Sequence, residues 1–266
     1  MDGLATGAHG VAPPGLGHNR KVSLMGPKSA SAEAGHTGVL FYEFMRFLNQ
    51  ILRPNSYFEI GTQAGGTLAK FTCDALCVDP EFKVQSNVIS GRKRTFFFQM
   101  PSDEFFADND LRTYFPRGVD LAFLDGMHRF EFLLRDFLHT EKCCHARSII
   151  LLHDCLPTNG RMAQRVEPEN EGWTGDVWKV LPILQKYRPD LRIFVLDCPP
   201  SGLVVCTGLK QDSRTLEEQY LNIVDEYFPM TLEEFGVDRL WNLYPTLKSA
   251  ELIDTPADLS AIMTVV

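Results

Sequence analysis

Hydrophobic residues at steps of three and four mark one long amphipathic helix in the first fifth of the chain. Its apolar positions are Leu40, Phe41, Phe44, Met45, Leu48, Ile51 and Leu52. This spacing places the apolar side chains on one helical face. The pair Arg53-Pro54 should end the helix, because the residue before a proline is biased away from the helical conformation.

Seven short apolar runs follow, and they are typical of strands in a buried parallel sheet. The runs are Tyr57–Ile60, Ala75–Val78, Thr95–Gln99, Val119–Leu124, Ser148–Leu152, Arg192–Leu196 and Leu203–Thr207. Helical patterns separate most of them, most clearly at Arg129–His139 and Asp176–Tyr187. Strands that alternate with helices predict an α/β fold with parallel pairing.

The last two runs are joined by six residues only, 197–202. A crossover helix does not fit in six residues, so the pattern predicts an antiparallel hairpin there. The expected fold is therefore an α/β sheet of seven strands, the last one antiparallel, with helices on both faces.

Three segments are expected along the chain. Residues 1–35 are rich in Gly, Ala, Pro and Ser and predict a flexible N-terminal tail. Residues 36–210 contain the strands and helices of the α/β domain. Residues 211–266 return to helix-like patterns, such as Leu216, Tyr220, Ile223 and Tyr227, and predict a helical C-terminal extension.

Composition narrows the class of protein. The chain has 266 residues and is 44% apolar, so wholesale disorder is excluded. A net charge of −8 argues against non-specific nucleic-acid binding and against docking on an anionic membrane. There is neither an apolar run of membrane-spanning length nor a signal-type leader in the sequence. The seven cysteines form no CxxC pair, which disfavours zinc and predicts reduced thiols in a cytoplasmic protein.

A glycine-rich turn follows the first strand, in the segment Phe58–Thr67. Glu59 closes the strand, and the turn contains Gly61, Thr62, Gly65 and Gly66. Glycines permit tight turning and close approach of a ligand to the backbone. The spacing is neither GxGxxG nor a phosphate-binding P-loop. Taken alone, the turn is as compatible with a plain strand–helix connection as with a cofactor site.

Acidic and hydroxyl residues follow the next two strands. Asp79 comes about twenty residues after the glycines, where a carboxylate can accept hydrogen bonds from both ribose hydroxyls of a nucleoside. The alternative is a solvated acid at a strand end. Ser102 and Asp103 follow the third strand and can lie near the adenine. They can equally serve as a helix N-cap and a first-turn acid, and these roles are compatible.

Two neighbouring strands each deliver an acid and a histidine to the same edge of the sheet. Asp125 and His128 follow the fourth strand, and His153 and Asp154 follow the fifth. Such residues can bind a divalent cation, and histidine is a general base near neutral pH. The alternative is that the histidines are structural. This clustering is the strongest local indication of chemistry in the sequence.

A polar loop, Pro157–Glu171, and the segment 172–179 precede the sixth strand. The loop carries Arg161 and Arg165, and its length suits a lid over the site. The arginines can hold an acidic substrate group or face solvent. Further along, Thr174 or Asp176 can cap the next helix, Trp173 can wall a substrate pocket, and Trp178 is expected in the core.

These motifs, in this order, resemble the class I S-adenosylmethionine-dependent methyltransferases from about Tyr57 to Leu209. The turn Glu59–Gly66 resembles the family's first motif, Asp79 matches its ribose-binding acid, and the expected hairpin matches its reversed seventh strand. The resemblance implies that 36–210 binds S-adenosylmethionine. It implies cofactor contacts from Glu59, Gly61, Thr62, Gly65, Gly66, Asp79, Ser102 and Asp103.

Within the class, the segments 123–131 and 151–154 resemble a bacterial subgroup similar to macrocin-type sugar O-methyltransferases. The resemblance implies methyl transfer to a hydroxyl of a sugar or natural product. Asp125, His128, His153 and Asp154 would be catalytic. Asp125 and Asp154 would bind Mg²⁺ together with His153, which stands where the sugar enzymes have an acid. A histidine ligand favours another divalent metal, or the site holds none.

Three rival functions remain at this stage. A nicotinamide oxidoreductase is disfavoured by the missing GxGxxG motif and by the hairpin. A non-catalytic S-adenosylmethionine-binding module would use the tail and the extension for a partner. A hydroxylase on the same scaffold would need an electron donor. The expected partner is a small-molecule substrate, without nucleic acid or membrane, and the tail and extension are candidate elements of a homo-oligomer.

Overall fold

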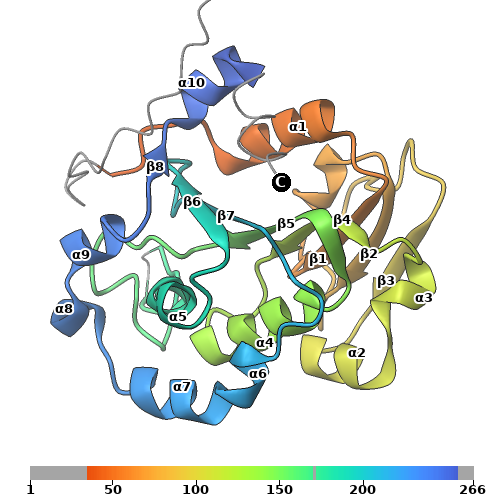
Figure 1. Ribbon diagram of the computed structural model, residues 1–266. Coiled ribbons are helices and arrows are strands. Elements are labelled where there is room, and N and C mark those ends of the chain that lie inside the picture. The colour runs from red at the N-terminus through yellow and green to blue at the C-terminus, as the bar shows by residue number, and fades with distance from the viewer. Residues whose placement is uncertain (1–34, 170–171, 257–266) are drawn as a thin grey trace, which may run out of the picture.

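The centre of the structure is an eight-stranded sheet (Figure 1), in a computed structural model that describes residues 35–169 and 172–256. The strands are β1 Ser56–Ile60, β2 Asp74–Val78, β3 Thr95–Phe98, β4 Val119–Leu124, β5 Cys144–His153, β6 Arg192–Leu196, β7 Leu203–Thr207 and β8 Thr246–Leu247. The expected strand positions are confirmed to within a residue or two, except that β5 begins earlier, at Cys144. Burial explains the agreement, since β1 and β7 are buried along their full length.

The strand order is β3-β2-β1-β4-β5-β7-β6-β8. The strands β1 to β5 pair in parallel, and β7 lies antiparallel between β5 and β6. The predicted α/β fold and its antiparallel hairpin are therefore confirmed. The structure adds an eighth strand, because β8 pairs in parallel with β6. That strand lies in the segment expected to be helical, and two residues are too short for a recognisable strand pattern.

Helices cover both faces of the sheet. They are α1 Phe41–Leu52, α2 Ser102–Asp108, α3 Leu111–Tyr114, α4 Phe130–Glu141, α5 Val180–Tyr187, α6 Thr215–Glu218, α7 Tyr220–Tyr227, α8 Leu232–Phe235, α9 Val237–Trp241 and α10 Ser249–Asp254, with the 3₁₀ turns η2 Leu68–Lys70 and η3 Val177–Lys179. Figure 1 shows α1 and α10 above the sheet, and α2, α4 and α5 below it. The helix expected over 176–187 is thus divided into η3 and α5.

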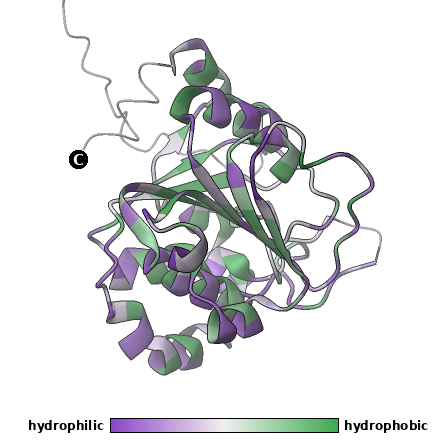
Figure 2. Cartoon of the chain, turned by 90° about the vertical axis from the view of Figure 1, so that its right-hand side faces the viewer, coloured by the Kyte–Doolittle hydropathy of each residue, from purple (hydrophilic) through white to green (hydrophobic). Residues whose placement is uncertain are grey.

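Two hydrophobic cores result from this layering. One lies between the sheet and the helices α2 to α9, and the other between the sheet and α1 with α10. Successive residues of β1 pack into opposite cores, since Phe58 and Ile60 lie in the first core and Tyr57 lies in the second. Figure 2 shows the strands as mostly hydrophobic and the helices as hydrophobic on one side only. Trp178 is completely buried in the first core, as expected.

The C-terminal extension is joined to the sheet at several points. The amide and hydroxyl of Ser249 both donate to Asp197, which follows β6, at 2.8 Å. The Trp241 indole donates to the carbonyl of Pro157 at 3.0 Å. The expected tail, 1–35, lies outside the described residues except for its last residue, Gly35. Over 35–169 and 172–256, no helix combines the length and the apolar character needed to cross a bilayer. None of the seven cysteines forms a disulfide.

Candidate active site

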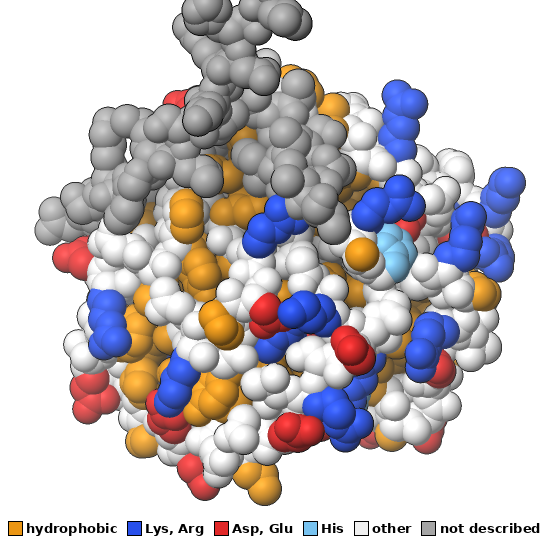
Figure 3. Space-filling model, in the orientation of Figure 1, with side chains coloured by type: hydrophobic (Ala, Val, Ile, Leu, Met, Phe, Trp, Pro, Cys, Tyr) orange, Lys and Arg blue, Asp and Glu red, His pale blue; other side chains and the backbone are white. Residues whose placement is uncertain are grey.

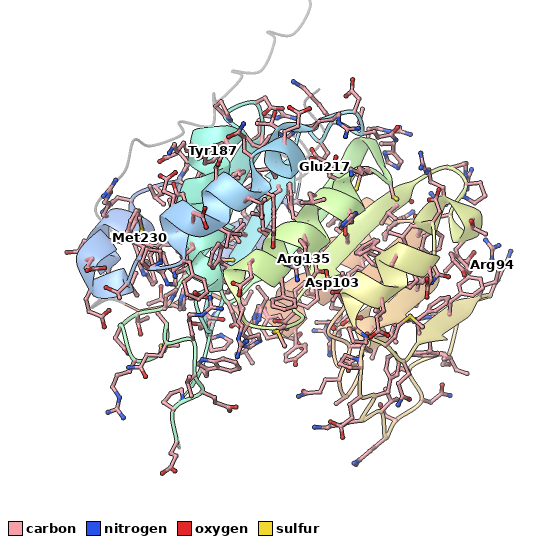
Figure 4. The ribbon with its side chains drawn as sticks, turned by 90° about the horizontal axis from the view of Figure 1, so that it is seen from below. Arg94, Asp103, Arg135, Tyr187, Glu217 and Met230 are labelled. Atoms are coloured by element: carbon pink, nitrogen blue, oxygen red, sulfur yellow. The ribbon has the colours of Figure 1, made fainter. Side chains whose placement is uncertain are left out.

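The carboxyl ends of β1, β4 and β5 lie side by side, and this register creates the site. Ile60 is the register partner of Leu124, which in turn pairs with Leu152. The residues that follow, Gly61, Asp125 and His153, are therefore neighbours at one edge of the sheet. Figure 4 shows two long loops that project from this side, in the tan of residues 80–94 and the pale green of the segment after β5.

The first glycine of the turn is required by close packing. Gly61 has φ +87°, and a Cβ atom there would lie 1.8 Å from the carbonyl oxygen of Asp125. A side chain cannot fit, so the turn after β1 packs directly on the turn after β4. Gly65, at φ +77°, faces Val88, and Gly66 faces the ring of Tyr42. Tyr42 of α1 thus covers the turn.

Glu59 and Thr62 present polar atoms that the described residues leave without a hydrogen-bond partner. Glu59 is completely buried, and the Thr67 hydroxyl donates to its Oε1. Its Oε2 has no partner, and neither has the buried hydroxyl of Thr62. Burial raises the pKa of Glu59 to about 8. A buried polar atom without a partner is costly unless a ligand satisfies it, so these atoms fit the polar end of a bound cofactor.

Asp79 fixes the backbone around the glycine-rich turn. One carboxylate oxygen accepts the amide of Gln63 and the other that of Glu81, each at 2.7 Å. A carboxylate oxygen has a second lone pair, so both oxygens can still accept from a ligand hydroxyl. The structural role seen here is compatible with the predicted ribose contact.

Ser102 and Asp103 lie at the start of α2. The N-cap position belongs to Pro101, and no side chain caps the helix, so the N-cap alternative for Ser102 is wrong. Asp103 forms a two-pronged ion pair with Arg135 of α4, at 2.7 and 2.6 Å (Figure 4). The hydrogen bonds from Arg135 lower the pKa of Asp103. This acid therefore joins two helices, a role that the sequence pattern did not indicate.

The two acids and two histidines at the ends of β4 and β5 form a single cluster. His153 Nδ1 lies 3.2 Å from Asp125 Oδ1 and 3.3 Å from Asp154 Oδ1. His128 Nε2 lies 3.1 Å from Asp154 Oδ2 and 3.7 Å from Asp125 Oδ1. Asp154 has φ +59°, an uncommon conformation for a residue with a side chain, and Ser201 donates to its Oδ1. The expected gathering at this edge is present.

Mutual attraction sets the charges of the cluster. Burial alone would lower the pKa of His153, but Asp125 and Asp154 outweigh burial and raise it to about 10. Burial would raise the pKa of Asp125, but His153 and His128 lower it to about 2. The same carboxylates raise the pKa of His128 against the effect of burial. The two carboxylates therefore favour the protonated form of His153.

Three donor atoms of this cluster are close enough together to hold one metal ion. Asp125, His128 and Asp154 each offer one atom, and these atoms lie within 4.8 Å of one another. This group contains His128 where the sequence interpretation had His153. Two oxygen donors and one nitrogen donor form a set that divalent transition metals accept.

The segment before η3 holds His128 in place. The ring of Trp173 lies against the His128 ring, with 4.9 Å between centroids. A Cβ atom at Gly175, φ +62°, would lie 1.7 Å from the His128 carbonyl oxygen. The amide of Asp176 donates to that oxygen at 3.3 Å, and its Oδ1 accepts the amide of Phe130 at 3.1 Å. Asp176 occupies the N-cap position of η3, as expected, but its side chain accepts the first amide of α4 instead of an amide of its own helix.

The described part of the expected lid is tied to the body of the protein. Arg165 pairs with Glu131 at 2.5 Å and with Asp176 at 2.6 Å. The proposed capture of an acidic substrate group by Arg165 therefore competes with two internal carboxylates. The Thr174 hydroxyl bonds to the Met162 carbonyl at 2.9 Å and caps no helix. The Trp173 indole donates to the Gln164 carbonyl, which closes the loop on itself.

Comparison with known proteins agrees with this architecture. Residues 45–155 match the family model described as "Methyltransferase domain". This segment is less than half of the chain and contains the glycine-rich turn, Asp79, Asp125 and Asp154. No curated protein matches the chain.

Similar solved structures include three methyltransferases. One is an S-adenosylhomocysteine-bound enzyme of Podospora anserina, at 13% identity and TM-score 0.45, covering 64% of this chain and 78% of that one. The second is the O-methyltransferase TomG of Streptomyces achromogenes, at 12% and 0.46, covering 63% and 78%. The third is an O-methyltransferase of Bacillus cereus, at 13% and 0.46, covering 69% and 92%.

The family match and the sheet order together confirm the predicted resemblance. A parallel sheet with an antiparallel strand inserted beside its last member, and a glycine-rich turn after β1, agree with the fold of class I S-adenosylmethionine-dependent methyltransferases, and residues 45–155 match a methyltransferase domain. The matched segment, 45–155, runs from within α1 to just past the end of β5.

Proposed function

We propose that this methyltransferase transfers a methyl group to a hydroxyl oxygen of a sugar or another natural-product small molecule. The observation that carries the proposal is the cluster of Asp125, His128, His153 and Asp154 directly beside the glycine-rich turn. It supports a position for the acceptor hydroxyl next to the cofactor. A site that only bound the cofactor would have no use for two acids and two histidines there.

S-adenosylmethionine, when bound, supplies a methyl group on a positively charged sulfur. The chain would bind it through the backbone of Gly61 and Gly65, which ligands can approach closely. Asp79 would accept the ribose hydroxyls. The unpaired oxygens of Glu59 and Thr62 would contact the polar methionine end. Ser102 lies where the adenine is expected, whereas Asp103 is engaged by Arg135 and is a weaker candidate.

The chain's own residues orient the acceptor and accept its proton. Asp125 and Asp154 accept hydrogen bonds, and His153 holds both carboxylates from behind, since its side chain is only 7% exposed. His128 is 25% exposed and faces Trp173, so its Nε2 can reach an incoming hydroxyl. Fixing the reactants in line and removing a proton are the two contributions that this reaction needs from a protein.

We include a divalent metal in the proposal. Asp125, His128 and Asp154 would hold it, and it would lower the pKa of a coordinated hydroxyl. A nitrogen donor in the set favours Mn²⁺ or Zn²⁺ over Mg²⁺. His128 would accept the proton in the metal-free enzyme and would serve as a ligand in the metal-loaded one. Turnover should therefore differ between EDTA and a buffer that contains the metal.

Calorimetric titration with S-adenosylmethionine and S-adenosylhomocysteine, in EDTA and in Mn²⁺, tests the proposal. We expect one site per chain, lost in Asp79→Ala. Asp74→Ala is the matched control, because Asp74 begins the same strand and pairs with Arg94 at its far end. Absence of binding by the unmodified chain in both buffers would overturn the proposed function.

A second assay addresses the acceptor. Formation of S-adenosylhomocysteine would be measured with a methyl glycoside and with catechol, each in EDTA, Mg²⁺ and Mn²⁺. Turnover with the glycoside supports a sugar acceptor. Turnover with catechol alone would replace the sugar by a phenol, and equal turnover in EDTA would remove the metal from the mechanism.

A further inference from the structure

A cavity lies at the opposite end of the sheet from the cluster, where the strands begin. Its volume is about 350 Å³, and its walls come from the starts of β1, β2, β3 and β4. A second hollow adjoins it through Thr72 and Cys73 and extends to Arg53. The β1 strand begins in the cavity and ends at the glycine-rich turn, so the two places are separated by five residues, or roughly 15 Å.

The two acids of this cavity, Asp74 and Asp120, are already engaged by groups of the protein. Asp74 accepts the Arg94 guanidinium at 2.9 and 2.7 Å and the Arg94 amide at 3.1 Å. Asp120 accepts the amides of Asn55 and Ser56 at 2.5 and 3.3 Å and faces His145 Nε2 at 2.7 Å. Both carboxylates are therefore held by contacts within the protein, and Asp74 is paired with a guanidinium.

The cations, in contrast, are in excess. Lys93 and Arg117 line the cavity and are exposed, and over 35–169 and 172–256 they form no ion pair and no side-chain hydrogen bond. The guanidinium of Arg53, in the adjoining hollow, donates to the Gln50 carbonyl at 3.4 Å. In Figure 3, Lys and Arg side chains gather on the right-hand side, where β2, β3 and α3 lie in Figure 1. A chain of net charge −8 therefore has a basic hollow here.

We propose that this cavity binds a small phosphate-bearing anion. Its volume is in the range of small-ligand sites. Two unpaired cations facing one hollow attract a dianion more strongly than a monoanion, and a guanidinium can bind phosphate with two parallel hydrogen bonds. This site is independent of methyl transfer.

Titration of the full chain, followed by ³¹P NMR, tests the proposal. The probes are inorganic phosphate and ribose 5-phosphate at constant ionic strength. We expect saturable binding that weakens as salt is raised, because exposed charges are screened. The double variant Lys93→Gln, Arg117→Gln should bind about tenfold more weakly or worse, since it removes two charge-assisted contacts.

Lys210→Gln with Arg214→Gln is the matched control. It removes the same charge from two exposed residues near the junction of the α/β domain and the extension, which pair with Asp190 and with Glu217. Tighter binding of ribose 5-phosphate identifies an organic phosphate, and equal affinity identifies the free anion. Absence of saturable binding, or equal weakening by both double variants, would overturn the proposal. Because Lys93 and Arg117 are exposed, an unchanged melting temperature will show that the variant is folded.

Discussion

The main-chain amide of Asp176 donates a hydrogen bond to the carbonyl oxygen of His128, and the Asp176 side chain accepts the amide of Phe130 two residues further on. One residue thereby fixes the backbone on both sides of a proposed catalytic histidine. Its other oxygen accepts Lys179 at 2.9 Å and Arg165 at 2.6 Å, and Asp176 and Lys179 are almost completely buried. Loss of this carboxylate should affect stability and turnover together.

Asp176→Asn should therefore destabilise the protein strongly. The variant leaves the Lys179 ammonium buried without its carboxylate, a type of change that costs about 3–5 kcal/mol of unfolding free energy. Urea unfolding measures the loss. Glu226→Gln is the control, because it breaks the exposed pair with Lys186 and should change stability little. Equal midpoints for the two variants would show that the Asp176 network contributes no more than a surface pair.

Gly61→Ala should abolish cofactor binding, whereas Gly91→Ala should not. Both glycines have positive φ, +87° and +82°, so both substitutions carry similar backbone strain. Only at Gly61 would the new Cβ atom lie 1.8 Å from a backbone oxygen, while at Gly91 the nearest atom is 3.7 Å away. Titration with S-adenosylhomocysteine compares the two. If Gly61→Ala binds as tightly as Gly91→Ala, the close approach at Asp125 is unimportant for the site.

Asp136→Asn should stabilise the protein at neutral and higher pH. Asp136 is 2% exposed, its Oδ1 has no partner among the described residues, and burial raises its pKa from 3.8 to about 7. Between about pH 4 and 7 the unfolded chain loses this proton and the folded chain keeps it, so the folded state is destabilised progressively as pH rises. The slope is at most about 1.4 kcal/mol per pH unit.

Unfolding free energies of Asp136→Asn and of the unmodified chain, measured from pH 4 to pH 8, check this sign. The difference should favour the variant increasingly with pH and level off above about pH 7. A constant difference across this range would mean that Asp136 is ionised in the folded protein.

Asp125→Ala and His153→Ala should lose turnover by roughly a hundredfold or more and keep cofactor affinity. Both residues belong to the cluster, and neither is expected to contact the cofactor. Single-turnover rates and titration with S-adenosylmethionine separate the two effects. Full activity in both variants would remove the cluster from the mechanism. If His128→Ala weakens cofactor binding alone, His128 belongs to the nucleoside pocket.

The strands were predictable because buried strands have continuous runs of apolar residues, which can be recognised in the sequence. Val119–Leu124 and Arg192–Leu196 have the same ends in sequence and structure. The gathering of Asp125 with His153 was predictable as well, because parallel neighbours end at the same edge of a sheet.

Contacts between elements that are distant in sequence were not predictable. Nothing local indicates that Asp176 caps α4, that Asp103 binds Arg135, or that Tyr42 covers Gly66. Each depends on which helix lies next to which after folding. The three-atom donor group contains His128, whereas the sequence interpretation had His153. The direction of each histidine ring is set by tertiary packing, which the sequence pattern does not indicate.

The pairing of β8 with β6 affects how the protein can be shortened. The segment after residue 210 supplies the outermost strand of the sheet, and Lys248 and Ser249 hold Asp197 at the end of β6. A chain ending at 210 would leave the end of β6 as an open edge with unpaired amides and carbonyls. Such an edge is a template for strand addition, so the shortened enzyme should self-associate.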